Sequence, residues 1–125
     1  MDSILTSIKK LLGIEDADTH FDPDIIMHIN SVLCILTQIG VGPSTGFTIT
    51  DKTESWTDFI TDITKIELVK TYVYYKVRLM FDPPINSAVL NSMTQMANEF
   101  EWRLNVAAST TTSKKKKKCG LIMAN

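Results

Sequence analysis

Hydrophobic residues recur at spacings of three and four through most of the chain, which is the period of an amphipathic α-helix. The first such pattern spans residues 2–13, with Asp2 placed to cap the helix and Gly13 placed to end it. The second begins at Asp22, which precedes a proline at the first helical position, and runs to about Ile39. The two apolar stripes are Ile4, Leu5, Ile8, Leu11 and Leu12, and Ile25, Ile29, Val32, Leu36 and Ile39.

The segment from Val41 to Thr50 is interrupted by glycine and proline, and its β-prone end, residues 47–50, predicts one short hairpin arm at most. Two patterns with a carboxylate three residues after a capping side chain, at 51–54 and 64–67, predict two further helix starts. The first of these helices is short. It carries Trp56, Phe59, Ile60 and Ile63 on one side.

The fourth predicted helix, from Lys65 to about Phe81, has two apolar stripes that lie roughly 130° apart at 100° per residue. They are Ile66, Val69, Val73, Val77 and Met80, and Leu68, Tyr72, Tyr75 and Leu79. We therefore expect other elements to cover this helix on both sides. Lys65 and Lys76 point between the stripes, where an unpaired ammonium group would be costly, so each needs a carboxylate or a route to solvent.

A fifth helix is predicted from Asn86 to Ala107, after the two prolines at 83 and 84. Its core stripe is Val89, Met93, Met96, Phe100, Leu104 and Ala107. Trp102 and Val106 fall on the opposite face, and an exposed tryptophan there is more often covered by a partner than left in water. This pair and the two lysines indicate assembly, although a monomer with irregular helices stays open as an interpretation.

The five helices predict an all-α fold, a small bundle with a glycine-rich loop, in a helical domain of residues 1–108. Residues 109–125 hold serine, threonine and five consecutive lysines and have no periodicity, so we expect a flexible tail. The net charge is −1, but without the lysine run eight basic residues face fourteen acidic ones, a net charge of −6. We do not expect a domain with this negative charge to bind the phosphate backbone of a nucleic acid.

Several function classes find little support in the sequence. Two cysteines are too few for a disulfide-built secreted scaffold, and no run approaches 18 apolar residues, so we expect no membrane segment. No phosphate-loop, dinucleotide, nucleophile-elbow or HExxH motif is present, so we expect neither an enzyme nor a cofactor. The alternation Asp16, Asp18, His20, Asp22 and Asp24 resembles the start of a calcium loop, but it lacks the turn glycine and has Met27 in place of the final glutamate. We expect a solvated loop there and no metal.

Three strings of the sequence carry a family resemblance: INSVLCILTQIGVGPSTGFTITDKTESWTDFI, ELVKTYVYYKVRLMFDPP and EFEWRLN. They resemble the small head–tail connector, or adaptor, proteins of long-tailed bacteriophages and prophages, and the likeness covers residues 1–107. The lysine-rich end departs from the family pattern. The resemblance implies a small α-helical subunit of a ring, usually of twelve copies, under the portal of a DNA-filled capsid.

The resemblance also implies a structural role in the virion neck, after assembly in the host cytoplasm. The implied partners are other copies of the chain, the portal protein, the next neck or tail-completion protein, and DNA that passes without sequence-specific binding. A ring subunit needs two different surfaces that bind its neighbours. This need would explain the apolar side chains outside the core stripe of the last helix and the lysines between the two stripes of the fourth. The residues that we assign to these contacts are Phe47, Ile49, Lys65, Lys76, Trp102 and Val106.

The tail allows two interpretations. In the connector it would dock on the portal or a neighbouring subunit through residues Lys114, Lys115, Lys116, Lys117, Lys118, Leu121, Ile122 and Met123. In the alternative, the chain is a small cytosolic helical protein that binds nucleic acid or an anionic surface through the same lysines. A monomeric mass together with salt-sensitive DNA affinity would favour the alternative.

Overall fold

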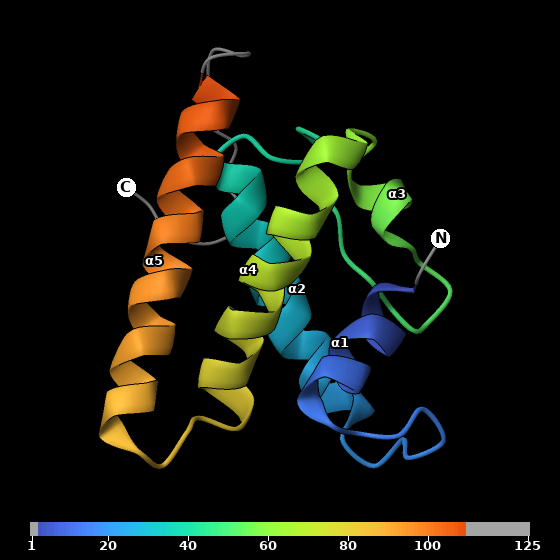
Figure 1. Ribbon diagram of the computed structural model, residues 1–125. Helices are drawn as coiled ribbons and strands as arrows, with labels where there is room; N and C mark the ends of the chain where they lie inside the picture. The colour runs from blue at the N-terminus through green and yellow to red at the C-terminus, as the bar shows by residue number, and fades with distance from the viewer. Residues whose placement is uncertain (1–2, 110–125) are drawn as a thin grey trace.

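In the computed structural model, which describes residues 3–109, five α-helices form a bundle and these residues contain no β-strand (Figure 1). The all-α prediction is therefore confirmed. The helices are α1 (Ile4–Leu12), α2 (Asp22–Gln38), α3 (Trp56–Phe59), α4 (Ile63–Phe81) and α5 (Ser87–Ser109). The last one continues one residue past the predicted end of the helical domain. The rest of the predicted tail, residues 110–125, lies outside the described residues.

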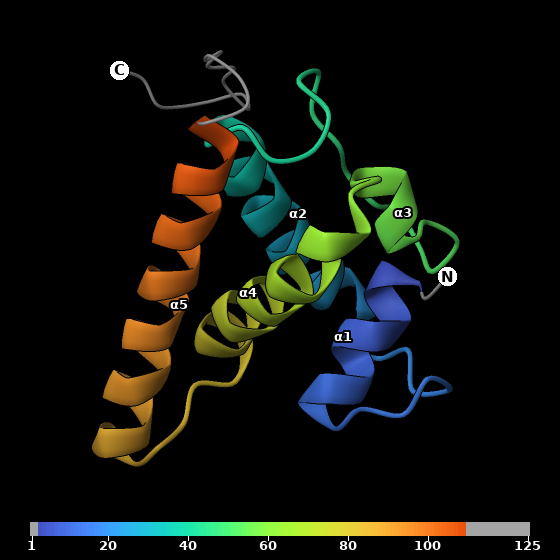
Figure 2. The ribbon, with the colours of Figure 1, turned by 45° about the horizontal axis from the view of Figure 1, so that its top comes forward.

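Helix α4 is the centre of the bundle and packs against all four other helices (Figures 1 and 2). Val69, Tyr72, Val73 and Val77 are fully buried on it. Two apolar stripes on one helix predicted that both sides would be covered, and the packing confirms this. Helix α5 lies on one side of α4, and α1 and α3 lie on the other (Figure 2).

The helix ends differ in detail from those expected. Ser3, not Asp2, caps α1, because its side chain accepts a hydrogen bond of 3.2 Å from the backbone N–H of Thr6. Gly13 ends α1 in the left-handed conformation, at φ 83°. Pro23 lies in the first turn of α2, as its second residue and not its first as predicted, because the helix begins at Asp22 and Phe21 takes the cap position.

The start predicted for α3 was wrong by several residues, and the start predicted for α4, Lys65, was wrong by two residues. The capping box of α3 is formed by Ser55 and Asp58, whose carboxylate accepts from the backbone N–H of Ser55 at 2.9 Å. Glu54 instead accepts from the backbone N–H groups of Thr50 and Asp51 and so closes the loop before α3. Ile63 becomes the first residue of α4 and is 73 % exposed, so it does not share the buried side of α3.

The hairpin arm predicted at residues 47–50 is absent, and the only β-bridge among residues 3–109 joins Ser3 to Ser55. The Asn30 side chain takes the place of a partner strand. It accepts from the backbone N–H of Ile49 at 2.7 Å and donates to the Ile49 carbonyl at 3.0 Å. A single amide on α2 thereby satisfies both backbone groups of Ile49, and the segment stays a loop.

The core stripe expected on α5 was also partly wrong. Leu104 and Ala97 are buried, but Val89 and Met96 are 48 % and 40 % exposed. Helix α5 packs mainly on α4, so only a narrow strip of its surface can be covered within one chain (Figure 1). A large part of α5 is left at the surface.

Candidate assembly surfaces

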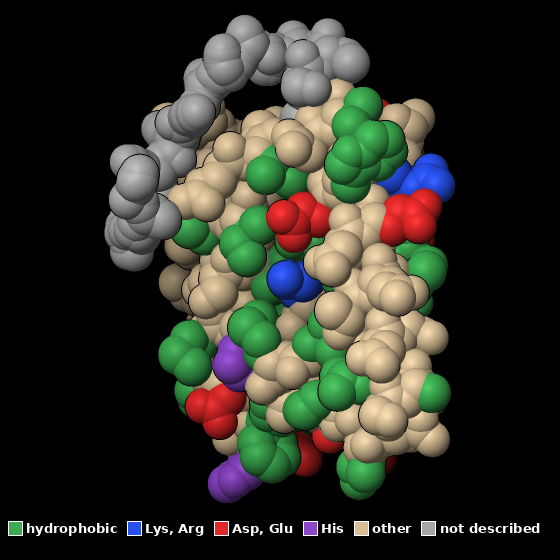
Figure 3. Space-filling model, turned by 90° about the vertical axis from the view of Figure 1, so that its left-hand side faces the viewer, with side chains coloured by type: hydrophobic (Ala, Val, Ile, Leu, Met, Phe, Trp, Pro, Cys, Tyr) green, Lys and Arg blue, Asp and Glu red, His purple; other side chains and the backbone are tan. Residues whose placement is uncertain are grey.

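The exposed surface of α5 is almost free of charge. Residues 87–98 contain no ionisable side chain, and Figure 3, which looks at this side of the molecule, shows few charged groups there. Solvent-facing helices normally carry charges on their outer face, whereas the cores of protein interfaces are depleted of them. By composition, this surface of α5 resembles an interface.

Four large apolar side chains are exposed on the same helix. Val89 and Met96 lie along one flank, and Trp102 and Val106 lie on the side that points away from α4. Trp102 is 65 % exposed and Val106 is 41 % exposed. The structure thus places this pair at the surface, where the helical pattern predicted it; its role in an interface stays a prediction.

The charges next to Trp102 neutralise each other. Arg103 donates two hydrogen bonds to the Glu99 carboxylate, of 3.0 Å from Nε and 2.7 Å from Nη2. This pair joins successive turns of α5 and leaves the surroundings of the indole close to neutral. A partner could therefore cover Trp102 without stranding an unpaired charge.

Contacts with α4 fix which side of α5 points outward. The Tyr72 hydroxyl donates to the Glu101 carboxylate at 2.7 Å, and the rings of Tyr75 and Phe100 stack with centroids 5.8 Å apart. Burial and the hydrogen bond to Glu101 raise the pKa of Tyr72 well above its ordinary value, so the hydroxyl keeps its proton. These contacts turn Glu101 inward and its neighbour Trp102 outward.

The two lysines assigned to assembly both lie half-buried on α4. Lys65 lies at the edge of ion-pair range, with its Nζ 4.0 Å from an Asp62 carboxylate oxygen one turn earlier. Two hydrogen bonds from Thr64 lower the pKa of Asp62, so this carboxylate is ionised at neutral pH. Lys76 makes no hydrogen bond or ion pair within the described part of the chain. The structure does not bring these lysines to Trp102 as one site.

Of the two loop residues assigned to partner contacts, Ile49 does not fit that assignment. Only 1 % of its surface is exposed, so its side chain belongs to the core of its own subunit. Phe47 is half-buried and packs on Phe59, with ring centroids 5.5 Å apart. Both side chains pack against other parts of their own subunit. No local pattern in the sequence indicates this packing.

On the opposite side of α4, the acidic loop between α1 and α2 closes around a lysine. Lys9 is 1 % exposed, and its ammonium group donates to the backbone carbonyls of Asp16 and Asp18 at 3.1 and 2.8 Å. It also pairs with the Asp22 carboxylate at 2.9 Å. The side chains of the described residues form no group that could hold a metal ion. The cation inside this acidic loop is therefore the ammonium group of Lys9.

The sequence analysis missed this role of Lys9, although a signal was present. Lys9 follows Leu5 by four residues and so lies on the apolar side of α1, where a charged side chain needs a buried partner. The Asp22 carboxylate and the backbone carbonyls of Asp16 and Asp18 supply that partner.

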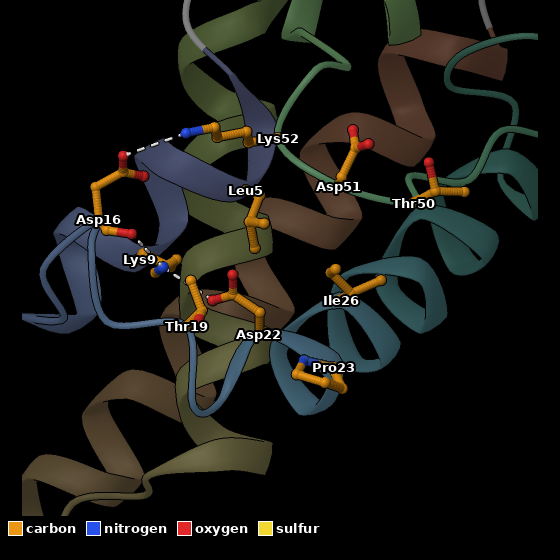
Figure 4. A pocket seen from close by; sticks show the side chains of 10 residues that line it. All are labelled: Leu5, Lys9, Asp16, Thr19, Asp22, Pro23, Ile26, Thr50, Asp51 and Lys52. Carbon is orange, nitrogen blue, oxygen red and sulfur yellow. Dashed lines mark hydrogen bonds and ion pairs between the residues drawn. The ribbon is translucent and has the colours of Figure 1, made fainter.

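A groove of about 530 Å³ lies beside Lys9, between α1, α2 and the loop at residues 50–52 (Figure 4). We call it the α1–α2 groove, and it is lined by Leu5, Lys9, Asp16, Thr19, Asp22, Pro23, Ile26, Thr50, Asp51 and Lys52. In Figure 4 the loop with Thr50 and Asp51 faces the α2 residues Pro23 and Ile26. The groove therefore combines apolar and acidic side chains.

The tail residues assigned to docking, Lys114–Lys118 and Leu121–Met123, lie outside the described residues. Among the helices that are described, none is long and apolar enough to cross a membrane.

Comparison with known proteins identifies the family. The family model described as phage connector protein matches residues 4–111, which include all five helices. No curated protein and no solved structure matches the chain. Since the matched region covers most of the sequence, this chain belongs to the phage connector protein family.

Proposed function

We propose that copies of this chain form a ring beneath the portal of a phage capsid, extend the DNA channel and join the head to the tail. The observation that carries the proposal is the difference between two sides of the subunit. One side is the charge-poor surface of α5 with Trp102, and the other is the acidic side with α1 and its loop. Two unlike surfaces on opposite sides suit heterologous contacts, which generate a ring when the rotation closes.

The charge distribution supports the same role. Residues 3–62 carry nine carboxylates and three lysines, and residues 63–106 carry four carboxylates and five basic side chains. A net negative body repels the phosphate backbone and does not retain it. DNA could slide through a channel of such subunits without sequence-specific binding.

In this proposal the role is structural and not enzymatic. The ring is placed in the neck of the virion, after its subunits have been made in the host cytoplasm. Its partners are its own copies, the portal protein on one side and the next neck or tail-completion protein on the other. Twelve copies are proposed, as in the rings that the family resemblance implied.

Light scattering and negative-stain microscopy test the proposal, on the full chain alone and after mixing with portal-bearing heads. We expect closed rings whose mass is an integer multiple of the 14.0 kDa subunit, or rings that appear on the heads. A chain that stays monomeric in solution and does not associate with the heads would refute it.

The five tail lysines favour one other function, binding of nucleic acid or an anionic surface by a monomer. A filter-binding assay over a range of salt concentrations separates the two. Salt-sensitive DNA affinity together with a monomeric mass would support this second function.

A further inference from the structure

The α1–α2 groove has the chemistry of a peptide-docking site. Its apolar part is formed by Leu5, Pro23 and Ile26, and carboxylates of Asp16 and Asp51 stand at its edge. Its volume of about 530 Å³ lies within the range of roughly 300 to 1,000 Å³ that is typical of ligand sites. A segment with both cationic and apolar side chains would match it.

The positive charges already at the groove do not neutralise its edge. Lys9 is committed to Asp22 and to two backbone carbonyls. Lys52 forms an ion pair with Asp16 at 3.8 Å, but the two side chains are 66 % and 53 % exposed, so solvent weakens this pair. Asp51 stays ionised, because hydrogen bonds from Thr53 lower its pKa. The edge of the groove can therefore accept added cations.

The chain itself contains a segment of the matching composition. Lys114–Lys118 supply five positive charges, and Leu121–Met123 supply three apolar side chains shortly after them. In this segment and in the α1–α2 groove alike, the charged residues lie next to the apolar ones. The lysines could therefore contact the carboxylates while the apolar residues enter the groove.

The arrangement of the helices favours docking between copies. The segment follows α5, which lies on the opposite side of α4 from α1 and the groove (Figures 1 and 2). The twelve residues from Ser109 to Leu121 reach at most about 40 Å when extended. In a ring of heterologous contacts the α5 side of one copy faces the α1 side of the next.

We propose that residues 114–123 of one copy dock in the α1–α2 groove of the adjacent copy, with the lysines on its carboxylates and the apolar residues on Pro23 and Ile26. This inference rests on the proposed ring. The docked lysines would add a salt-sensitive, electrostatic contribution to the contact between subunits, next to that of the apolar surface around Trp102.

Isotope-coded photo-crosslinking of the full chain tests the proposal. A benzophenone amino acid replaces Leu121 in unlabelled protein, which is assembled with an equal amount of ¹⁵N-labelled protein of the original sequence. After irradiation, mass spectrometry identifies the joined peptides, and light scattering of the same sample reports whether rings are present. We expect unlabelled tail peptides joined to ¹⁵N-labelled peptides of residues 16–26 or 50–52.

A matched pair of variants at Thr19, an exposed residue that lines the groove, tests the charge complementarity. Thr19→Lys should reduce the inter-copy crosslink at least several-fold, whereas Thr19→Glu should maintain or increase it. Raising the salt concentration should reduce the crosslink of the original chain in the same way. Glu67→Lys, an exposed site on α4 that does not line the groove, is the control and should leave the yield unchanged.

The outcomes separate the two proposals. Rings without crosslinks to the groove would overturn the docking proposal and leave the ring intact. Crosslinks to the groove only within one copy would overturn docking between copies. The absence of rings both in solution and on portal-bearing heads would contradict the proposed function and, with it, the docking that rests on it.

Discussion

Replacing Trp102 by alanine is the most direct perturbation of the α5 surface. An aromatic side chain buries up to about 250 Å², and 65 % of Trp102 is exposed, so a neighbour that covered it fully would remove roughly 160 Å² from water. At about 25 cal/mol per Å², this amounts to ~4 kcal/mol as an upper bound. Because a neighbour need not cover the indole completely, and fixing this side chain costs conformational entropy, we expect a loss of about 2 to 4 kcal/mol per contact, or roughly 30-fold to several hundred-fold in Kd.

Tryptophan fluorescence provides a suitable assay because the chain has only two tryptophans. Trp56 is 1 % exposed and donates to the Ser7 hydroxyl at 2.8 Å, so its emission should be insensitive to assembly. Trp102 should emit at long wavelength in the free subunit and shift to shorter wavelength as protein concentration drives assembly. Light scattering over the same concentrations gives the apparent Kd of the original chain and of Trp102→Ala.

The second tryptophan is the matched control. Trp56→Ala removes a buried side chain and should lower the melting temperature and the helicity of the subunit, since such truncations cost about 3 to 5 kcal/mol. Trp102→Ala should leave both unchanged and weaken only the assembly. If Trp102→Ala assembles with the original Kd, or if the emission of Trp102 does not shift on assembly, the reasoning about this surface is refuted.

Three further predictions concern the stability of the subunit. Lys9→Met should lower the free energy of unfolding by about 3 to 5 kcal/mol in urea denaturation, because it leaves the Asp22 carboxylate without its buried partner; a loss below about 1 kcal/mol would contradict this role. Gly42→Ala should lower the melting temperature, since the residue has φ 86° and an added Cβ would lie 2.5 Å from the Phe59 ring, whereas Gly46→Ala, also at positive φ but with open space around it, should be milder. The raised pKa of Tyr72 means that its contribution to stability is present below pH 10 and lost as pH rises above it, so Tyr72→Phe should weaken the alkaline decline of the melting temperature; equal declines in both proteins would contradict this.

The parts of the fold that the sequence predicted are those decided by local spacing. The two stripes of α4 required cover on both sides, and α4 is the helix at the centre of the bundle. The position of Trp102 outside the core stripe of α5 predicted its exposure, since helical geometry alone decides which residues share a face. The proline at residue 23 predicted the start of α2 for an equally local reason.

The features that could not be predicted depend on competition between neighbouring hydrogen bonds or on side chains distant in the sequence. The capping pattern at residues 51–54 gave no helix, because Glu54 bonds to the loop before it while Ser55 and Asp58 form a better box. The residues at 47–50 have β-propensity, but the Asn30 amide, nineteen positions away, takes the place of a strand. Burial of Ile49 in its own core follows from the same contact and removes it from the candidate surface.

The core stripe misassigned on α5 and the overlooked burial of Lys9 both show that this subunit leaves groups at its surface that it does not cover or neutralise itself. Val89 and Met96 were expected in the core, and their exposure means that the chain has more apolar helix surface than one bundle can cover. Residues 15–24 carry five carboxylates, of which only that of Asp22 pairs with the buried Lys9, so the opposite side has more negative charge than the subunit neutralises. Excess apolar surface on one side and excess negative charge on the other would both be reduced by copies that meet head to tail, with a basic, partly apolar segment crossing between them.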